Sequence, residues 1–321
     1  LGTGDLVQQL VPKKVDTALV LRSVDAGPFS TCAVSNDGQL VMWGADTDGQ
    51  FGTGMAGTGS VVPVAVPIGP AVSCSVGLSH VCARLMSGKA MCWGDNAFGK
   101  LGSGDPNYGI MTPVEVASFS NTKWISASDY GHTCGVKGDG TAWCWGRGSA
   151  GQLGDGNLET SALPLPVANL AAVRSVATAG VRSCALLEAG SVHCWGWGPL
   201  GNGVATNSPS PVQATGLGMG SRIDVSGETD TVVCVVDGGT VKCWDRDLTD
   251  FATPYVEVLA PEAVQLPEAA SEVATGRAHA CAIGESGTVY CWGANNTGQL
   301  GVGTTNASAT PVIAQAPWAG L

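Results

Sequence analysis

The stretch that decides the fold is GRAHACAIGESGTVYCWGANNTGQLGVG, which runs from Gly276 to Gly303. Residues 280–283 are a short apolar run, residues 284–287 (GESG) have the composition of a turn, and residues 288–292 return with β-branched and aromatic side chains. This order predicts a β-hairpin. A Gly-rich segment, residues 293–303, leads the chain out of the hairpin, where positive φ angles favour glycine.

Five more copies of this pattern precede it, ending at Gly44, Gly94, Gly146, Gly196 and, imperfectly, Asp245. The hairpin tryptophans are Trp43, Trp93, Trp145, Trp195, Trp244 and Trp292, at intervals of 50, 52, 50, 49 and 48 residues. A clear Gly-x-(Leu/Phe)-Gly exit follows four of the six hairpins, beginning at Gly49, Gly99, Gly151 and Gly298. A repeat of this length cannot bury its own apolar face, so the copies must pack against one another.

The pattern resembles the regulator of chromosome condensation (RCC) repeat family, whose blades read G-x-x-H-x-x-A-L, G-x-V-x-x-W-G-x-N-x-x-G-Q-L-G-x-G. The resemblance covers nearly the whole chain, and residues 276–303 match almost position for position. It implies an all-β fold, a β-propeller of four-stranded antiparallel blades, which in this family usually number seven. The family's guanine-nucleotide exchange activity depends on a wedge-like insertion, and no repeat here is long enough to hold one, so exchange activity is less favoured.

Each repeat of about 50 residues divides into four predicted strands. The inner strands are residues 18–24, 72–76, 124–128, 173–178, 223–226 and 273–275, and the hairpins supply the second and third strands. Outer strands contain proline, at residues 63–64, 113–116, 211–212 and 311–312, and a further one is predicted at 11–15. Proline suits an edge strand because no ladder donor is needed on its solvent side.

The two ends of the chain do not balance. The sequence contains six hairpins but seven predicted outer strands, and Trp318 resembles Trp124, which starts an inner strand. This count favours a seven-bladed plan over a six-bladed ring closed by overlapping terminal strands, within one propeller domain over residues 1–321. Residues 1–4 (LGTG) align with residues 101–104 (LGSG), so we expect the chain to begin inside a repeat and to be part of a longer polypeptide.

Ten of the 12 cysteines form five hairpin pairs: Cys82 with Cys92, Cys134 with Cys144, Cys184 with Cys194, Cys234 with Cys243, and Cys281 with Cys291. Directly opposed residues of antiparallel strands lie within disulfide reach. Buried free cysteines are the alternative, but five pairs at near-constant spacing favour disulfides, and zinc is disfavoured because no Cys-x-x-Cys occurs. Cys32 and Cys74 remain, and a bridge between the first two blades would pair them.

Disulfides indicate an oxidising compartment: secreted, periplasmic or cell surface. Two N-glycosylation sequons, at Asn295 and Asn306, fit a secreted glycoprotein. The net charge of −11 with 15 Lys plus Arg argues against nucleic acid as a partner. The sequence contains no apolar run of about 18 residues, so membrane insertion is not predicted.

No catalytic, cofactor or metal site is predicted. His80, His132 and His279 occupy one column of three repeats, and equivalent positions on different blades spread around a ring. We therefore interpret them as structural histidines that bond within their own blade. No phosphate loop, nucleophile elbow or paired-carboxylate spacing is present, so the sequence predicts no enzyme.

The favoured function is a non-enzymatic extracellular interaction or assembly module that binds other extracellular or cell-surface proteins. The alternative is a secreted inhibitor that caps an enzyme with one propeller face. Repeat five departs most from the pattern, at residues 245–272, which hold seven acidic residues and one base. We hypothesise that this stretch binds a partner through Asp247, Asp250, Phe251 and Tyr255, the alternative being drift in a tolerant loop.

Overall fold

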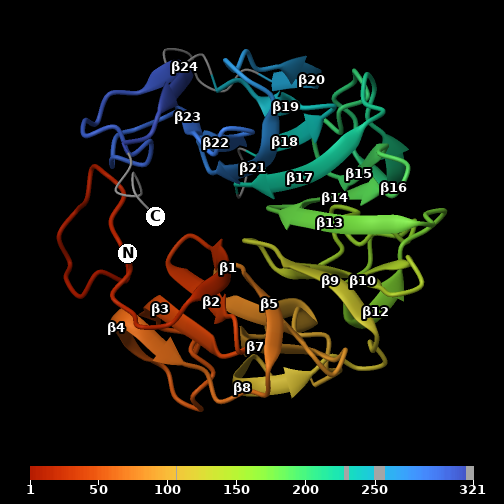
Figure 1. Cartoon of the computed structure of the whole chain (residues 1–321). Coiled ribbons are helices and arrows are strands. Elements are labelled where there is room, and N and C mark those ends of the chain that lie inside the picture. The colour runs from red at the N-terminus through yellow and green to blue at the C-terminus, as the bar shows by residue number, and fades with distance from the viewer. Residues whose placement is uncertain (106, 228–230, 249–256, 316–321) are drawn as a thin grey trace.

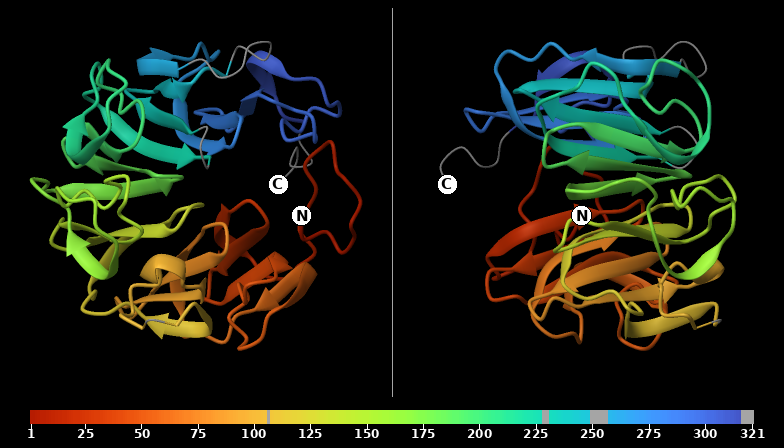
Figure 2. Two further views of the ribbon diagram at one scale, coloured as in Figure 1. Left: turned by 180° about the vertical axis from the view of Figure 1, so that it is seen from behind. Right: turned by 90° about the vertical axis from the view of Figure 1, so that its right-hand side faces the viewer.

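A computed structural model describes residues 1–105, 107–227, 231–248 and 257–315. Its strands form six four-stranded antiparallel sheets arranged as blades around a ring, which makes a six-bladed β-propeller (Figure 1). In each blade, four consecutive strands pair in sequence order, with the first strand innermost and the fourth at the rim. The view along the side shows the blades stacked face to face (Figure 2).

The first three blades account for residues 21–166. Blade 1 comprises β1 (Leu21–Ala26), β2 (Ser30–Ser35), β3 (Leu40–Asp46) and β4 (Gly57–Ala65). Blade 2 comprises β5 (Ala71–Val76), β6 (His80–Leu85), β7 (Ala90–Asp95) and β8 (Gly109–Glu115), with the 3-10 helix η1 (Ala97–Gly99) between its last two strands. Blade 3 comprises β9 (Thr122–Ala127), β10 (His132–Lys137), β11 (Ala142–Gly146) and β12 (Ser161–Pro166).

The other three blades complete the array. Blade 4 comprises β13 (Val173–Ala179), β14 (Arg182–Leu187), β15 (Val192–Gly196) and β16 (Ser208–Gln213). Blade 5 comprises β17 (Gly220–Ser226), β18 (Val232–Asp237), β19 (Thr240–Arg246) and β20 (Glu257–Ala263). Blade 6 comprises β21 (Ala270–Gly276), β22 (His279–Gly284), β23 (Val289–Gly293) and β24 (Ser308–Ile313).

The strand plan agrees with the expectation from the repeats, except at the N-terminus and in the number of blades, since the described residues form six blades and not the favoured seven. The predicted inner strands overlap the observed ones, and each proline-containing outer segment within residues 63–312 lies in an observed outer strand. Residues 11–15, predicted as an outer strand, form none. The whole segment 1–20 runs without strands along the rim between β24 and β4, and Trp318 lies outside the described residues (Figures 1 and 2).

The glycine that follows the hairpin tryptophan in five of the six blades is required by a close approach of two loops. Gly94 has φ +101°, and a Cβ there would lie 2.5 Å from the carbonyl oxygen of Ser79. Gly146 and Gly196 repeat this geometry, with φ of +100° and +103°. Because an L-residue at these angles is strained and would meet backbone, the Trp-Gly pair is fixed by the fold. Asp245 stands in this place in blade 5 with φ 81°.

The core lies between the blades. Each hairpin tryptophan from Trp93 to Trp292 is buried and packs into the apolar cluster of the preceding blade, as Trp145 does with Leu101 and Val116. Apolar surface that one blade cannot bury alone is thus covered by its neighbour. No helix in the described parts of the chain is long and apolar enough to cross a membrane.

Candidate interaction face and blade junctions

The loops of each blade gather on two faces of the ring. Backbone bonds tie the loop after each first strand to the exit after the third strand: Ala45 N donates to Phe29 O (2.9 Å), Arg147 N to Gly131 O (2.9 Å) and Trp197 N to Val181 O (3.1 Å). Both kinds of loop therefore lie at one edge of the blades, which we call the exit face. The turns between second and third strands lie at the opposite edge, the hairpin face.

The exit face of blades 1 to 4 carries exposed aromatic side chains. Phe29 and Tyr130 lie in loops after first strands, Phe98 lies in η1 after β7, and Trp197 directly follows β15. A soluble surface seldom exposes several large aromatic residues together, and such clusters mark interaction sites. This face is therefore the strongest candidate for partner contact within the described residues.

Arg147 connects two of these aromatic residues. Its guanidinium carbon lies 5.2 Å from the ring centroid of Phe98 and 4.7 Å from that of Tyr130, and its Nε donates to Ser149 Oγ at 3.0 Å. Contacts of this kind hold the charge in place over the rings. Arg147 contacts Phe98 and Tyr130, whereas Phe29 and Trp197 lie on the exit face of blades 1 and 4. These five exit-face residues are called the aromatic–arginine patch. Trp, Tyr and Arg are the residue types that most often dominate binding energy at protein interfaces.

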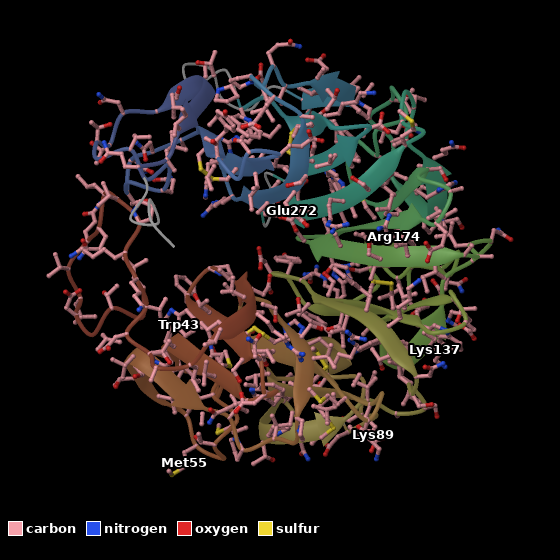
Figure 3. All side chains as sticks on the ribbon, in the orientation of Figure 1. Trp43, Met55, Lys89, Lys137, Arg174 and Glu272 are labelled. Carbon is pink, nitrogen blue, oxygen red and sulfur yellow. A yellow bond between two sulfur atoms is a disulfide. The ribbon has the colours of Figure 1, made fainter. Side chains whose placement is uncertain are left out.

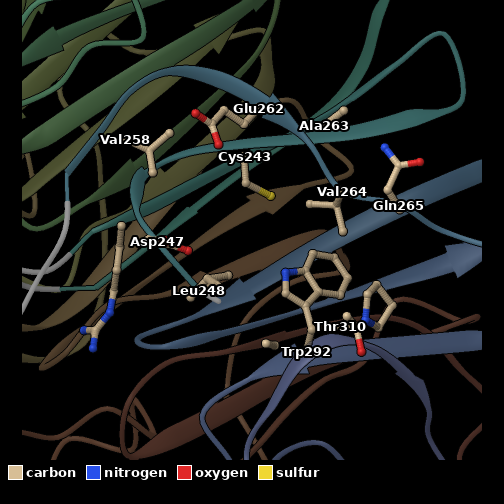
Figure 4. Close-up of a pocket in the computed structure, with 13 residues that line it drawn as sticks. Cys243, Asp247, Leu248, Val258, Glu262, Ala263, Val264, Gln265, Trp292 and Thr310 are labelled. Carbon is tan, nitrogen blue, oxygen red and sulfur yellow. The ribbon is translucent and has the colours of Figure 1, made fainter. Parts of the chain in front are cut away.

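The stretch hypothesised to bind a partner is only partly described. Asp247 is half-buried and lines a cavity of about 260 Å³ between blades 5 and 6, together with Leu248, Val258 and Trp292 (Figure 4). Asp250, Phe251 and Tyr255 lie outside the described residues. Their role in binding stays a prediction.

The acidic residues of that stretch do not form one surface. Asp245 is fully buried, both carboxylate oxygens of Glu272 lie 2.8 Å from Nε of Arg222, and Glu268 accepts hydrogen bonds from Ser286 and Tyr290. These three carboxylates are thus each engaged by other groups of this chain, Asp245 in the interior and Glu268 and Glu272 nearer the surface.

All 12 cysteines are paired, and the structure contains the five predicted hairpin disulfides. Their Cα atoms lie 4.0–4.2 Å apart in directly opposed register. The sixth disulfide joins Cys32 of β2 to Cys74 of β5, with a Cα–Cα distance of 6.4 Å, and so links blades 1 and 2. Sulfur–sulfur bonds appear in yellow in Figure 3.

Two histidines of the column bond to the next blade and not within their own, so that expectation was wrong. His80 Nε2 lies 2.9 Å from Thr133 Oγ1, and His132 Nε2 lies 2.8 Å from Ser183 Oγ. Ser183 in turn donates to the carbonyl of Gln152 (2.8 Å). Because the serine proton is committed, His132 donates its Nε2–H to Ser183.

Backbone carbonyls at these contacts also accept hydrogen bonds from the hairpin tryptophans. Lys100 O accepts both Thr133 Oγ1 (2.8 Å) and Trp145 Nε1 (2.9 Å), and Gln152 O also accepts Trp195 Nε1 (2.9 Å). Histidine, hydroxyl, carbonyl and indole thus form one buried junction between successive blades. These contacts explain why the histidine column and the tryptophan column occur together.

Burial keeps these histidines neutral. Desolvation lowers the pKa of His132 to about 3 and, with the nearby charge of Lys100, lowers the pKa of His80 well below 6.5. A neutral ring whose Nε2–H is already donated is suited to a structural role and not to proton transfer. Among the described residues, no group of three His, Cys, Asp or Glu side chains is arranged to hold a metal ion.

Asn295 of the first sequon is part of an exit-loop clamp. Its side chain is 1 % exposed, its Nδ2 donates to the carbonyls of Thr304 and Asn306 (both 2.9 Å), and its Oδ1 accepts Leu300 N (2.9 Å). Asn96 makes the equivalent contacts in blade 2. The folded structure leaves no room for a glycan on this nitrogen. Asn306 is exposed, and its glycosylation stays a prediction.

Sequence comparisons identify the repeats. A family model described as the regulator of chromosome condensation (RCC1) repeat matches residues 21–50, 125–152 and 270–299, and a second model with that description matches residues 139–187 and 286–317. The ultraviolet-B receptor UVR8 of Arabidopsis thaliana is 29% identical over 211 residues, which are 61% of this chain and 46% of the receptor. The chain thus spans about half the length of that relative.

Solved structures show the same fold. Human WBSCR16 superposes with a TM-score of 0.84 and 21% identity, covering 96% of this chain and 86% of that one. Prp20p of Saccharomyces cerevisiae gives a TM-score of 0.78 and 19% identity, covering 93% and 78%. The receptor kinase CR4 ectodomain of Physcomitrella patens gives a TM-score of 0.51 and 18% identity, covering 87% and 63%. Models of the regulator of chromosome condensation (RCC1) repeat thus match parts of blades 1, 3, 4 and 6, and the chain shares the propeller fold of these structures.

Proposed function

We propose that this chain is a non-enzymatic protein-binding module of an oxidising compartment, secreted or on a cell surface, and that it captures its partner with the aromatic–arginine patch. The patch is the observation that carries the proposal. It places Phe29, Tyr130 and Trp197 in the solvent on one face, with the Arg147 guanidinium held over two rings. Propeller function resides in such loops and not in the blades that hold them.

The chemistry of the patch describes the partner surface. Aromatic rings around the Arg147 guanidinium fit a partner with a hydrophobic pocket beside a carboxylate. Relatives of the fold support protein partners, since the propeller protein Prp20p has binding properties to Gsp1p and histones. The partners proposed here are instead extracellular or cell-surface proteins.

The compartment is inferred from the disulfides. Thiols in the cytosol are kept reduced, so a chain whose 12 cysteines form six bridges fits an oxidising environment. The CR4 ectodomain shows that this kind of propeller occurs outside the cell. Alkylation of the protein taken from its native source, without reductant, should modify no cysteine. Full alkylation would contradict the extracellular placement.

Binding is tested with a patch variant and a control of equal exposure. Phe29→Ala/Arg147→Ala/Trp197→Ala removes three of the five patch residues, whereas Trp124→Ala/Met219→Ala removes two exposed apolar residues elsewhere on the ring. A protein crosslinked to the wild-type chain is purified, and its Kd is measured against all three forms. Loss of central aromatic and arginine contacts typically costs about 2 kcal/mol or more, so we expect a rise in Kd of at least about 30-fold for the patch variant.

The control variant should bind with unchanged Kd. Equal binding by the patch variant and the wild type would reject the patch as the binding surface. If the captured protein is an enzyme and binding inhibits it, the result would favour the alternative function, a secreted inhibitor that acts through the same face.

A further inference from the structure

The inner strands begin at the hairpin face, and a basic side chain lies at the start of several of them. Arg22 Nη2 donates to the carbonyl of Ala71, the first residue of the next inner strand (2.6 Å), and Lys123 Nζ donates to the carbonyl of Val173 in the same way (3.4 Å). Arg22 on blade 1 and Lys123 on blade 3 are therefore equivalent. Arg174 on β13 continues the series in blade 4 (Figure 3).

The two equivalent positions differ in the residue that faces them from the next blade. Lys123 forms an ion pair with Glu188 Oε1 at 2.5 Å. Glu188 follows β14 and Met86 follows β6, and the backbone N of each donates to the residue directly before the inner strand of its own blade (both 2.8 Å). Arg22 therefore faces an exposed methionine where Lys123 faces a carboxylate.

Arg84 adds a second positive charge beside Arg22. It stands on β6 directly before Leu85, which pairs with Ala71, the residue that accepts the hydrogen bond from Arg22. The equivalent residues of four other hairpins are apolar, at most 1% exposed and packed in the junction with the next blade: Val34, Val136, Leu186 and Val236. Arg84 is thus a charged residue at a position that the fold otherwise uses for its core.

Arg84 forms no ion pair within the part of the chain that the structure describes, and its Nε is buried without a hydrogen-bond partner there. Acidic residues of the neighbouring turns are engaged elsewhere, since Glu115 pairs with Lys89 and Asp37 accepts a hydrogen bond within its own turn. Burial and the charge of Arg22 lower the pKa of the Arg84 guanidinium. Such an uncompensated charge lowers stability, and departures of this kind concentrate at functional sites.

We propose that Arg22 and Arg84 form a binding site on the hairpin face that takes the carboxylates of an acidic segment of a partner polypeptide. The site is separate from the aromatic–arginine patch on the exit face. Two uncompensated guanidinium groups accommodate two neighbouring carboxylates, and the planar guanidinium matches a carboxylate in a pair of charge-assisted hydrogen bonds. The net charge of −11 does not prevent this contact, because charges beyond about 8 Å are largely screened at physiological salt.

Two ion pairs on the same face support a carboxylate as the ligand group. Lys123 takes Glu188 of the next blade, and Arg222 takes Glu272 of the next blade (2.8 Å). Basic residues at the start of the inner strands therefore bind carboxylates where the chain supplies them. Beside Arg22, the chain supplies Met86, which is 53% exposed and offers an apolar contact to a residue next to the acidic ones.

The test compares the binding of a short acidic peptide to variants of this site. The probe is acetylated and amidated tetraglutamate, with tetraglutamine as the neutral control, and its Kd is measured by isothermal titration calorimetry at constant ionic strength. Arg84→Val restores the residue type of the other blades and removes the charge. Met86→Glu supplies a carboxylate within the chain, as Glu188 does for Lys123, and Met86→Gln is its neutral match.

We expect tetraglutamate to bind the wild type and tetraglutamine not to bind. Arg84→Val and Met86→Glu should each raise the Kd of tetraglutamate at least about tenfold. Met86→Gln should change this Kd less than about twofold, and so should Lys89→Gln, at a lysine of the same turn that is already paired. Arg84→Val should also raise Tm because it removes an uncompensated charge, so its loss of binding cannot come from loss of folding.

The proposal is overturned if the wild type does not bind tetraglutamate, or if Arg84→Val binds it with the wild-type Kd. Inorganic phosphate and sulfate are titrated at the same ionic strength. Tighter binding of either ion than of tetraglutamate, lost in Arg84→Val, would assign the site to a tetrahedral oxyanion and reject an acidic polypeptide. Phe29→Ala/Arg147→Ala/Trp197→Ala should bind tetraglutamate with unchanged Kd, so this site and the exit-face patch are tested independently.

Discussion

Arg182 on β14 and Asp245 on β19 form a buried ion pair between blades 4 and 5. Thr231 Oγ1 also donates to Asp245, and the Arg182 guanidinium donates from Nε (3.0 Å) and Nη2 (2.6 Å) to Trp197 O. Arg182 replaces the column histidine and Asp245 replaces the glycine after tryptophan. The two departures from the repeat are thus one compensated substitution, so Asp245 has a structural explanation that needs no partner.

Removing only Asp245 from this ion pair should lower the free energy of unfolding. Asp245→Gly restores the repeat but leaves the Arg182 charge buried and unpaired, which typically costs about 3–5 kcal/mol. Arg182→Met/Asp245→Gly removes both charges and should recover most of that loss. Urea unfolding at pH 7 measures the free energy of each form. A double variant as unstable as Asp245→Gly alone would show that the pair does more than neutralise its own charges.

The six disulfides should contribute unequally to stability. The Cys32–Cys74 bridge spans 42 residues of sequence, whereas Cys134–Cys144 spans 10. In the chain-entropy model these loops correspond to about 4 and about 3 kcal/mol of stabilisation. Cys32→Ser/Cys74→Ser should therefore lower the free energy of unfolding by more than Cys134→Ser/Cys144→Ser. The opposite order in denaturant titrations would show that strain or residual structure outweighs loop length.

The period of the sequence explains how much of the fold could be predicted. Trp145 and the Cys134–Cys144 pair recur at fixed places in a repeat of constant length, and the alternation of a strand then sets their register. The same period also gave the strand order of every blade. Residues 11–15 broke this rule because an outer strand needs a third strand to pair with, and none of the described residues supplies it.

Contacts between repeats were harder to predict. A residue type that recurs in several repeats shows its place within a blade, but it does not show which residue of the next blade it contacts. A signal was nevertheless present: where one repeat has His132, the next has a hydroxyl, Ser183, and His80 is matched by Thr133 in the same way. The aromatic–arginine patch had no such signal. Its members come from four repeats, and only the packing of successive blades side by side brings them to one face.

Protonation of His132 should weaken the protein in acid. Its pKa is about 3 in the folded chain, against about 6.5 when unfolded, because burial disfavours the charged ring. The unfolded state therefore binds more protons between these values, and stability is lost as pH falls below about 6.5. From pH 7 to 4.5 this amounts to about 2–3 kcal/mol. His132→Gln, which keeps a donor for Ser183, should flatten this part of the pH profile.

The matched control is His193→Gln, at a less buried histidine whose pKa is also lowered by desolvation. Its effect on the slope between pH 7 and 4.5 should be smaller. Identical slopes for the wild type and His132→Gln would mean that His132 does not govern acid sensitivity.

Asp224 should give the opposite pH dependence. Its carboxylate, on inner strand β17, accepts Thr275 N (2.6 Å) and Thr275 Oγ1 (2.8 Å). Desolvation, with a contribution from the charge of Asp25, raises its pKa to about 6. Because the carboxyl pKa is raised in the folded chain, the contribution of Asp224 to the free energy of unfolding is fully present below about pH 3.8. This contribution is lost as the pH rises through 6. At pH 8 the ionised group therefore costs about 2–3 kcal/mol relative to its unfolded pKa.

Asp224→Asn removes that cost and keeps an oxygen acceptor for Thr275. We expect the variant to exceed the wild type in unfolding free energy by about 2 kcal/mol at pH 8 and to match it at pH 4. Asp224→Ser is the second arm, because Ser75 and Ser126 accept the equivalent backbone bonds in blades 2 and 3. Urea unfolding from pH 4 to 8 decides the point. If both variants have a lower free energy of unfolding than the wild type by the same amount at every pH, the hydrogen bonds to Asp224 outweigh the cost of its charge.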